Sequence, residues 1–298
     1  MEPMSRKTAH DFDQELLVLF DAYVHGAIDR RTFLDRAGKF AVGGVTAMML
    51  LDQLSPSFAV QVVSADDKRI EAKHLEYESP RGYGKARAYF VHPAAPKGKL
   101  PGVLVIHENR GLNPHIEDVA RRFSLAGFLA FAPDALFPLG GYPGDEDKAR
   151  ELFAKLDQAK TREDFVAAAA LLKARPECTG KIGAVGFCYG GGMVNYLATR
   201  LGGDLSAAVC FYGSAPDSGE VRKIKAPLMV HSAETDERIN ASWPEFERAL
   251  KAANVPYERF LYPGTQHGFH NDTTPRYDAA AAKLAWERTL AFFEKHLR

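Results

Sequence analysis

The stretch IGAVGFCYGGG, residues 182–192, decides the fold of this chain. Its apolar first half, Ile182 to Val185, predicts a buried strand. Gly186 and Gly190 then flank Cys188 at the spacing of a tight strand-to-helix turn that presents a nucleophile. Glycines are needed there because the apex residue has strained backbone geometry and larger neighbours would clash with the adjacent strand and helix. Apolar residues from position 193 onward predict a helix that begins at once.

The predicted turn places Cys188 at the N-terminus of that helix. Free backbone N–H groups and the positive end of the helix dipole favour a thiolate over a thiol at such a position. The alternative interpretation is a small buried cysteine in a glycine-rich turn with no chemical role.

Two further candidate residues follow Cys188 along the chain. The predicted strand at 227–231 runs into a loop that carries Asp236, and the strand at 259–262 runs into a loop that carries His267. Taken singly, Asp236 could be a turn or helix-cap residue and His267 an ordinary loop histidine. The order nucleophile, acid, base, each just past a strand end, is typical of one class of hydrolase and indicates a catalytic triad.

These motifs resemble those of the dienelactone hydrolases, a cysteine-dependent family with the α/β-hydrolase fold. The resemblance covers about residues 69–298 and rests on four segments: GFCYGG at 186–191, FYG at 211–213, HGF at 267–269 and IHENRG at 106–111. It implies cleavage of a small ester or lactone through a cysteine nucleophile and an acyl-enzyme thioester.

The resemblance also implies supporting roles. Glu108 is expected to hold the resting thiol of the cysteine, and the backbone N–H groups of Asn109 and Tyr189 are expected to form the oxyanion hole. The family binds a substrate carboxylate with arginines, one of them four residues after the catalytic histidine. Asn271 stands there in this chain, so Arg110 is a candidate replacement, although a surface arginine is an equally good interpretation.

The remaining pattern alternates strands with helices, which predicts an α/β fold: a mostly parallel sheet with helices on both faces. The expected strands beyond those above are 71–78, 86–92, 103–105, 128–132 and 207–211, and the expected helices are 116–126, 145–156, 163–174 and 277–296. The apolar loop 135–142, which ends in Tyr142, is expected either to form a wall of the substrate pocket or to be an ordinary surface connection.

The composition argues against nucleic acid and anionic membranes as partners of this chain. The chain has 298 residues, of which 46% are hydrophobic and 26% charged, enough for one large catalytic domain at 65–298. Its 38 basic residues balance 38 acidic ones, so no global field attracts nucleic acid or an anionic membrane. The resemblance implies a small-molecule ester or lactone as the partner, and we expect either a monomer or a homodimer.

The three cysteines, 178, 188 and 210, suggest neither a disulfide framework nor zinc, because they are odd in number and contain no C-x-x-C pair. Cys210 is expected in the core and Cys178 in a loop. His267 and His270 have a spacing that metals use, but two loop histidines without a third ligand are weak evidence. No metal or cofactor is predicted.

Residues 1–64 form a separate segment with two competing interpretations. The run DRRTFL at 29–34, the apolar stretch 41–51 and the small residues at 57–59 resemble a twin-arginine signal, which implies export to the periplasm. Alternatively, the apolar residues between Leu16 and Val24 have helical spacing, which predicts a helix that stays in a cytoplasmic protein and packs, for example at a dimer contact. The apolar stretch is too short to span a membrane in the mature protein.

Three other functions are alternatives to a hydrolase of small esters or lactones. A carboxylesterase of broad specificity would use the same residues. A non-catalytic binding module on the same fold is disfavoured because all three triad positions are filled. A thiol-based redox enzyme would need a resolving cysteine near Cys188, and the sequence gives no sign that Cys178 or Cys210 is near it.

Overall fold

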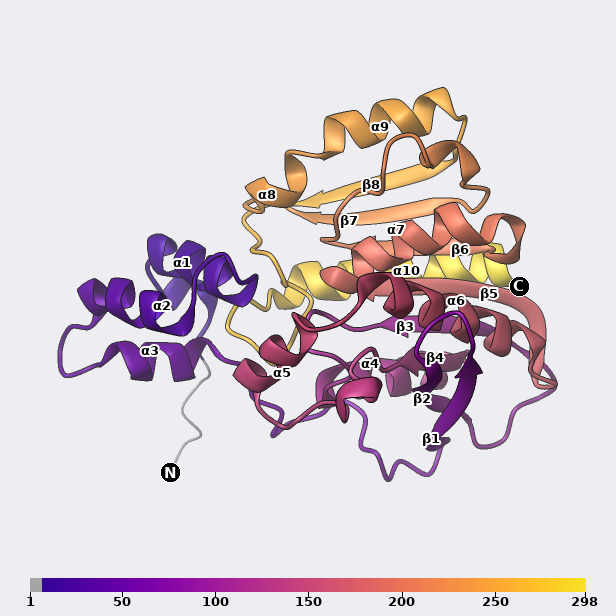
Figure 1. Cartoon of the computed structure of the whole chain (residues 1–298), viewed down its shortest axis with the longest axis horizontal. Helices are drawn as coiled ribbons and strands as arrows, with labels where there is room; N and C mark the ends of the chain where they lie inside the picture. Colours follow the sequence, from indigo (N-terminus) through magenta and orange to yellow (C-terminus); the bar gives the residue numbers. More distant parts are fainter. Residues whose placement is uncertain (1–6) are drawn as a thin grey trace.

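The computed structural model of the chain describes residues 7–298 and contains an eight-stranded sheet with helices on both faces (Figure 1). The order across the sheet is β1-β2-β4-β3-β5-β6-β7-β8. The strands are β1 (Ile70–Ser79), β2 (Gly84–Pro93), β3 (Leu100–Ile106), β4 (Leu129–Pro133), β5 (Cys178–Phe187), β6 (Ala207–Phe211), β7 (Leu228–Ala233) and β8 (Tyr257–Tyr262). The predicted fold class is confirmed.

Strand direction determines where the candidate site residues meet. β2 pairs antiparallel with both β1 and β4, and every pairing from β4 through β3 and β5 to β8 is parallel. The carboxyl ends of β3, β5, β7 and β8 therefore lie at one edge of the sheet. The loops that carry Glu108, Cys188, Asp236 and His267 leave the sheet at that edge.

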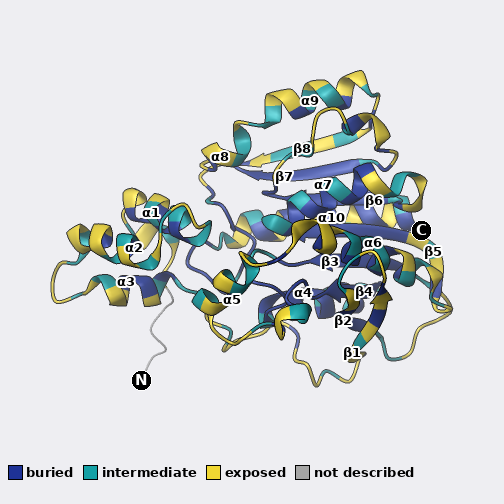
Figure 2. Cartoon of the chain, viewed as in Figure 1, coloured by how far each residue is buried: buried dark blue, intermediate teal, exposed yellow. Residues whose placement is uncertain are grey.

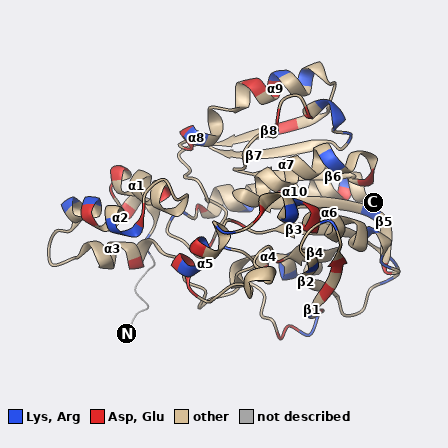
Figure 3. Cartoon of the chain, in the orientation of Figure 1, with Lys and Arg blue, Asp and Glu red and all other residues tan. Residues whose placement is uncertain are grey.

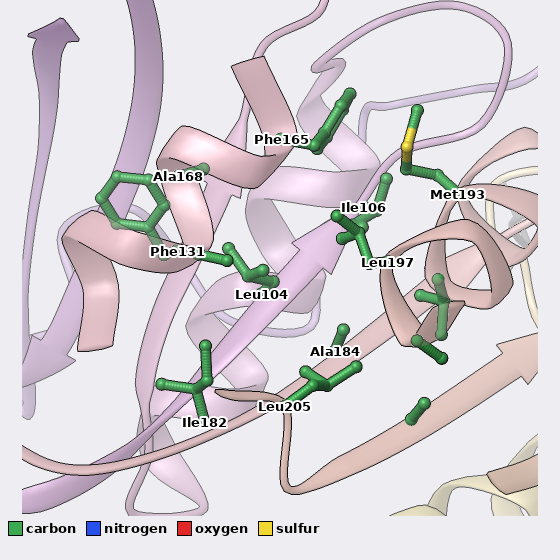
Figure 4. Packing of buried hydrophobic residues seen from close by; sticks show 14 of the residues in the cluster. Leu104, Ile106, Phe131, Phe165, Ala168, Ile182, Ala184, Met193, Leu197 and Leu205 are labelled. Atoms are coloured by element: carbon green, nitrogen blue, oxygen red, sulfur yellow. The ribbon is translucent and has the colours of Figure 1, made fainter. Parts of the chain in front are cut away.

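The core has two layers because side chains alternate across each strand. On β3, Leu104 and Ile106 belong to one buried cluster, whereas Val103 and Val105 belong to the other. Figure 4 shows the first cluster, where Leu104 and Ile106 lie with Ile182, Phe165 and Leu197 between the sheet and its helices. Strands β4, β6 and β7 are buried along their whole length, and β3 and β5 are buried toward their carboxyl ends (Figure 2), which explains why these segments appear as continuous apolar runs in the sequence.

The helices divide between the two faces of the sheet. α6 (Gln158–Ala174), α7 (Tyr189–Leu201) and α9 (Trp243–Ala252) cover one face, and α4 (Pro114–Leu125) and α10 (Ala279–Leu297) cover the other. Two shorter helices, α5 (Glu146–Phe153) and α8 (Glu237–Asn240), lie beyond the carboxyl edge of the sheet, on the side of the N-terminal segment (Figure 1). The predicted helices are all present, with ends shifted by a few residues.

The described part of the N-terminal segment, residues 7–64, is folded. It forms α1 (Gln14–Val24), α2 (Arg30–Ala37) and α3 (Ala47–Leu54), which Figure 1 shows as a separate helical layer beside the sheet domain. We call these three helices the N-terminal unit. Its own core contains the apolar residues of the helical pattern, namely Leu16, Leu17, Phe20, Tyr23, Phe33, Ala37, Leu50, Leu51 and Leu54. In the structure, the apolar residues of this segment therefore pack with one another.

The features that suggest an export signal are part of this packed unit. Arg30 lies in α2 and pairs with Asp147 at the start of α5, at 3.0 Å. The apolar stretch 41–51 supplies Leu50 and Leu51 to the buried core of the unit through α3. No helix among residues 7–298 is long and apolar enough to cross a membrane.

One expectation about the cysteines is wrong. Cys178 is the first residue of β5 and is buried, because β5 begins four residues earlier than its apolar run. Cys210 lies in β6 and is buried, as expected, and burial raises the pKa of its thiol to about 12. Elsewhere the charged side chains of both signs are interspersed over the elements (Figure 3), in agreement with the balanced composition.

Replacing Phe33 with Ala should destabilise the N-terminal unit by about 3 to 5 kcal/mol, because it removes a fully buried ring and leaves a cavity. We expect limited proteolysis to cleave within residues 25–60 faster than in the wild type. Val18, which is 60% exposed on α1, provides the matched control, since Val18→Ala should leave the cleavage rate unchanged. Equal cleavage of Phe33→Ala and wild type would show that the unit is not held by this core.

Candidate active site

Cys188 stands at the apex of a sharp turn between β5 and α7. Its φ of 55° and ψ of −112° place a non-glycine residue in a strained backbone region. The close approach of the chain explains the flanking glycines: a Cβ on Gly186 would lie 2.1 Å from the carbonyl oxygen of Gly190, and one on Gly190 would lie 2.2 Å from that of Ile106. The turn therefore has the geometry of a nucleophile elbow, as the sequence predicts.

The position of Cys188 also affects the charge of its sulfur. Tyr189 is the first residue of α7, so its N–H group lacks an acceptor within the helix and the positive end of the helix dipole lies beside the cysteine. The backbone N–H of Cys188 itself donates to the carbonyl of Phe211 at 3.0 Å, which fixes the elbow to the end of β6. An anion on this sulfur would face favourable dipoles.

Asp236 and His267 form a buried pair. Asp236 follows β7 and caps α8, where one carboxylate oxygen accepts from the backbone N–H of Ile239 at 3.3 Å. Its other oxygen is 2.5 Å from Nδ1 of His267. Because Nδ1 faces the carboxylate, it carries a proton, and Nε2 is the ring nitrogen left for chemistry. That Nε2 is buried and has no hydrogen-bond partner among the described residues.

A third group completes the surroundings of the sulfur. His25, at the C-terminal end of α1, places Nε2 at 3.3 Å from Cys188 Sγ. The His25 and His267 rings are nearly perpendicular, with centroids 4.7 Å apart. The sulfur and one ring nitrogen from each histidine lie within 4.8 Å of one another, and they are the one cluster of such groups in residues 7–298 close enough to hold a metal ion. A proton shared between the thiol and His25 accounts for the contact of that imidazole with the sulfur.

The local charges shift the pKa of each member of this cluster. Burial raises the pKa of the Cys188 thiol, but the charges of His267 and His25, together with the hydrogen bond between His25 and the sulfur, outweigh it and lower that pKa to about 6. Burial lowers the pKa of His267, whereas the thiolate and the Asp236 carboxylate raise it, to about 10. Between these values the thiolate and imidazolium forms of the pair prevail.

The loop after β3 holds the residues expected to assist. Glu108 accepts a hydrogen bond from the side-chain amide of Asn271, with 3.0 Å between Oε2 and Nδ2. The side chain of Asn109 donates to the carbonyl of Val24 at 3.0 Å, and Arg110 donates to the same carbonyl at 3.1 Å. The structure thus brings the loop to the candidate site and ties it to the end of α1.

Arg110 and Tyr142 lie together rather than on the open surface. Both contact Glu146 on α5: the Tyr142 hydroxyl donates to its carboxylate at 2.8 Å, and Arg110 pairs with it at 3.6 Å. They line a cavity of about 330 Å³, to which Glu108 also contributes. A second cavity, of about 890 Å³, lies along Asp236 and His267 and is bounded by α1. His270 does not join His267, because its ring stacks on Phe187 with centroids 5.2 Å apart.

Sequence reasoning missed His25. The helical spacing of its apolar neighbours indicates a packed helix but not its docking site. Nothing in the local sequence relates residue 25 to a cysteine 163 positions away. Only the spatial arrangement of the N-terminal unit reveals the contact.

The fold and the elbow geometry define the class of the protein as an α/β-hydrolase. Within this class the chain belongs to the Dienelactone hydrolase family, which it matches over residues 86–297, and it is a carboxylic-ester hydrolase. A separate match, to the YqhI-like family, covers residues 4–41.

Individual relatives agree with this assignment. The chain is 30% identical over 259 residues to a Saccharolobus solfataricus protein named "Putative carboxymethylenebutenolidase", covering 75% of this chain and 98% of the relative. It is 52% identical over 114 residues to "Putative hydrolase fragment YghX" of Escherichia coli, covering 38% of this chain and 97% of that fragment. A crystal structure described as "Putative Dienelactone Hydrolase" of Klebsiella pneumoniae superposes with a TM-score of 0.67 at 29% identity, covering 76% of this chain and 99% of the other.

Proposed function

We propose that the protein hydrolyses a small ester or lactone with Cys188 as nucleophile, His267 as general base and acid, and Asp236 as the group that orients the imidazole. One observation carries the proposal: a cysteine at a strained elbow lies beside the unpartnered Nε2 of a histidine whose Nδ1 is held by a buried carboxylate. A non-catalytic binding module would not need this costly arrangement of buried polar groups.

In the acylation step, the thiolate of Cys188 attacks the carbonyl carbon of the substrate. A carbon–sulfur bond forms, and the carbonyl oxygen becomes an oxyanion. The N–H groups of Asn109 and Tyr189 are proposed to bind this oxyanion, a contribution of about 3 to 4 kcal/mol per donor in other enzymes. The carbon–oxygen bond to the leaving alkoxide then breaks, and His267 supplies its proton.

In the deacylation step, neutral His267 removes a proton from water as the water oxygen attacks the thioester carbon. The carbon–sulfur bond breaks, the carboxylic acid leaves and the imidazolium–thiolate pair is restored. Asp236 stabilises the charged imidazole in both steps, because its carboxylate stays on Nδ1.

We propose that the substrate occupies the cavity beside Glu108, while Asp236 and His267 line the second cavity of about 890 Å³. The volume of the cavity beside Glu108, about 330 Å³, is at the lower end of the range for small-molecule sites, and Arg110 and Tyr142 supply polar atoms to its wall. We propose these two residues as substrate contacts. A panel of p-nitrophenyl esters of increasing acyl length and of lactones, run before and after thiol alkylation, tests the proposal. Short esters or lactones should be preferred and alkylation should stop turnover; equal rates for all lengths would favour a broad carboxylesterase.

We further propose that residues 1–64 and 65–298 form two structural units. The apolar core of the N-terminal unit is separate from the two clusters that flank the sheet. The family match to residues 86–297 and the separate match to residues 4–41 support the same division.

Glu108 is proposed to oppose ionisation of Cys188, since a carboxylate near a thiolate raises the pKa of the thiol. Replacing Glu108 with Gln should shift the pH profile of iodoacetamide alkylation at Cys188 to lower pH, from a wild-type midpoint of about 6. The side-chain amide can still bond with Asn271, so the fold should be kept. Exposed Glu245→Gln is the matched control and should leave the profile in place. Coincident profiles for Glu108→Gln and wild type would show that Glu108 acts on the loop through Asn271 and not on the thiol.

A further inference from the structure

The C-terminal end of α1 presents a carboxylate and an imidazole one helical turn apart. His25 Nδ1 lies 2.8 Å from the backbone carbonyl of Asp21 and 3.3 Å from its carboxylate. With two acceptors beside it, Nδ1 carries a proton, and Nε2 is the nitrogen that reaches beyond the helix. Asp21 is itself held by Arg276, whose Nη1 is 3.2 Å from the carboxylate. Arg276 thus holds Asp21 in place, and Asp21 in turn fixes the orientation of the His25 imidazole.

The outward-facing nitrogen of the Asp21–His25 pair, His25 Nε2, reaches the sulfur of Cys188, which also belongs to the proposed triad. His25 Nε2 is 3.3 Å from Cys188 Sγ, and the second neighbour of that nitrogen is Nη2 of Arg238, at 3.2 Å. His267 also faces the sulfur, with its own carboxylate, Asp236, behind it. Two carboxylate–imidazole pairs thus converge on one cysteine, the first from the N-terminal unit and the second from the sheet domain.

The contacts that dock α1 keep His25 in this place. The carbonyl of Val24, one residue before His25, accepts from both Asn109 and Arg110 on the loop after β3. The carbonyl of Tyr23 accepts from Arg150 of α5 at 2.9 Å, and the Tyr23 hydroxyl bonds with Asp147. Consecutive residues at the helix end are anchored to two elements of the sheet domain, so the approach of His25 to the sulfur is specified by the fold.

We propose that Asp21 and His25 form a second acid–base pair on Cys188, so that the N-terminal unit supplies part of the active site. The inference rests on the proposed role of Cys188 as nucleophile. In the resting enzyme the thiol proton passes from Sγ to an imidazole nitrogen, and the resulting thiolate lies between two imidazole groups. His267 keeps the proton transfers to the leaving group and from water, while His25 stabilises the thiolate until the substrate carbonyl takes its electron pair.

The test measures ionisation of Cys188 apart from turnover. His25→Gln removes the second imidazole with little change in shape. We expect the midpoint of the Cys188 alkylation profile to rise by about one pH unit, which reduces the alkylation rate below the wild-type midpoint by up to about tenfold. Asp21→Asn should shift it in the same direction by less. His10, which is exposed and precedes α1, provides the matched control, since His10→Gln should have the wild-type profile.

The charged neighbours of His25 require one more variant. Asp21, Arg238, Cys188 and His267 face it, and Arg238 alone could favour a thiolate through its fixed charge. Arg238→Gln is therefore measured in parallel, with all assays in EDTA and all variants checked by thermal melting. A shift in Arg238→Gln with none in His25→Gln would overturn the inference, as would turnover by His25→Gln above that of the wild type.

The experiments distinguish a failure of the proposed ester hydrolase mechanism from a failure of the proposed Asp21–His25 pair. Loss of turnover and of the acyl-enzyme in Cys188→Ala would support Cys188 as the nucleophile and would not test the role of His25. If Cys188 proves to be the nucleophile and its alkylation profile is the same in His25→Gln as in wild type, the second pair is refuted while the ester hydrolase mechanism stands. If His25→Gln also lowers kcat with KM little changed, His25 acts on the reacting sulfur and not on substrate binding.

Discussion

The Cys188→Ala variant is expected to lose ester hydrolysis almost completely, with a fall in kcat of at least about 10³-fold. The variant removes the atom that attacks the carbonyl, and neither neighbouring imidazole can form the same thioester. Mass spectrometry of wild-type protein quenched during turnover of a p-nitrophenyl ester should show one acyl group on the peptide that contains Cys188, and the variant should show none.

Cys178→Ala is the matched control for this experiment. Cys178 lies at the opposite end of β5, away from the elbow, and is buried. Its replacement should leave kcat near the wild-type value. Near-native turnover by folded Cys188→Ala would instead eliminate the covalent mechanism and direct attention to water activated by His267.

His267→Ala should also lower kcat by about 10³-fold or more, and Asp236→Asn should have an effect of similar order. Asparagine at position 236 can still accept from the N–H of Ile239, so the cap of α8 is kept while the negative charge beside Nδ1 is lost. The imidazolium then loses its counter-ion and the ring is free to adopt the wrong tautomer. The kcat values and melting temperatures of the two variants check this expectation.

The pH dependence of turnover follows from the same charges. Below about pH 6 the Cys188 thiolate becomes protonated, so activity should fall with falling pH.

His270→Gln serves as the control for His267→Ala, because His270 packs against Phe187 and lies outside the triad. A His270→Gln loss as large as that of His267→Ala would show that the loop as a whole, rather than its proposed base, is responsible.

The residues covered by the two family matches explain why relatives alone do not identify His25. The Dienelactone hydrolase match begins at residue 86, after the helices that carry this side chain. The YqhI-like match covers residues 4–41 and includes position 25, but it is a match to a different family. The contact between them is a property of the whole chain, in which α1 lies across the loop after β3.

The sequence alone determined the fold and three of the site residues. A strand, a glycine-flanked cysteine and a helix form an elbow because only glycine permits the approach of Gly186 to Gly190. The residues of β3 after Leu100 are all buried and alternate between the two clusters, so this strand requires helices on both faces of the sheet. Since parallel strands end at one edge, the loops after β5, β7 and β8 had to bring Cys188, Asp236 and His267 together.

Only the tertiary structure shows that α1 docks at the carboxyl edge of the sheet, beside Cys188. Local spacing indicates that α1 buries one face, but a helix docks where complementary donors and charges lie, and these come from Asn109, Arg110 and Arg150, far away in the chain. The same limitation applies to Glu108, whose hydrogen bond with Asn271 joins two loops that no pattern relates. Short-range periodicity fixes which residues are buried, whereas the partner of a buried polar group depends on contacts between distant segments, and only the folded chain specifies those.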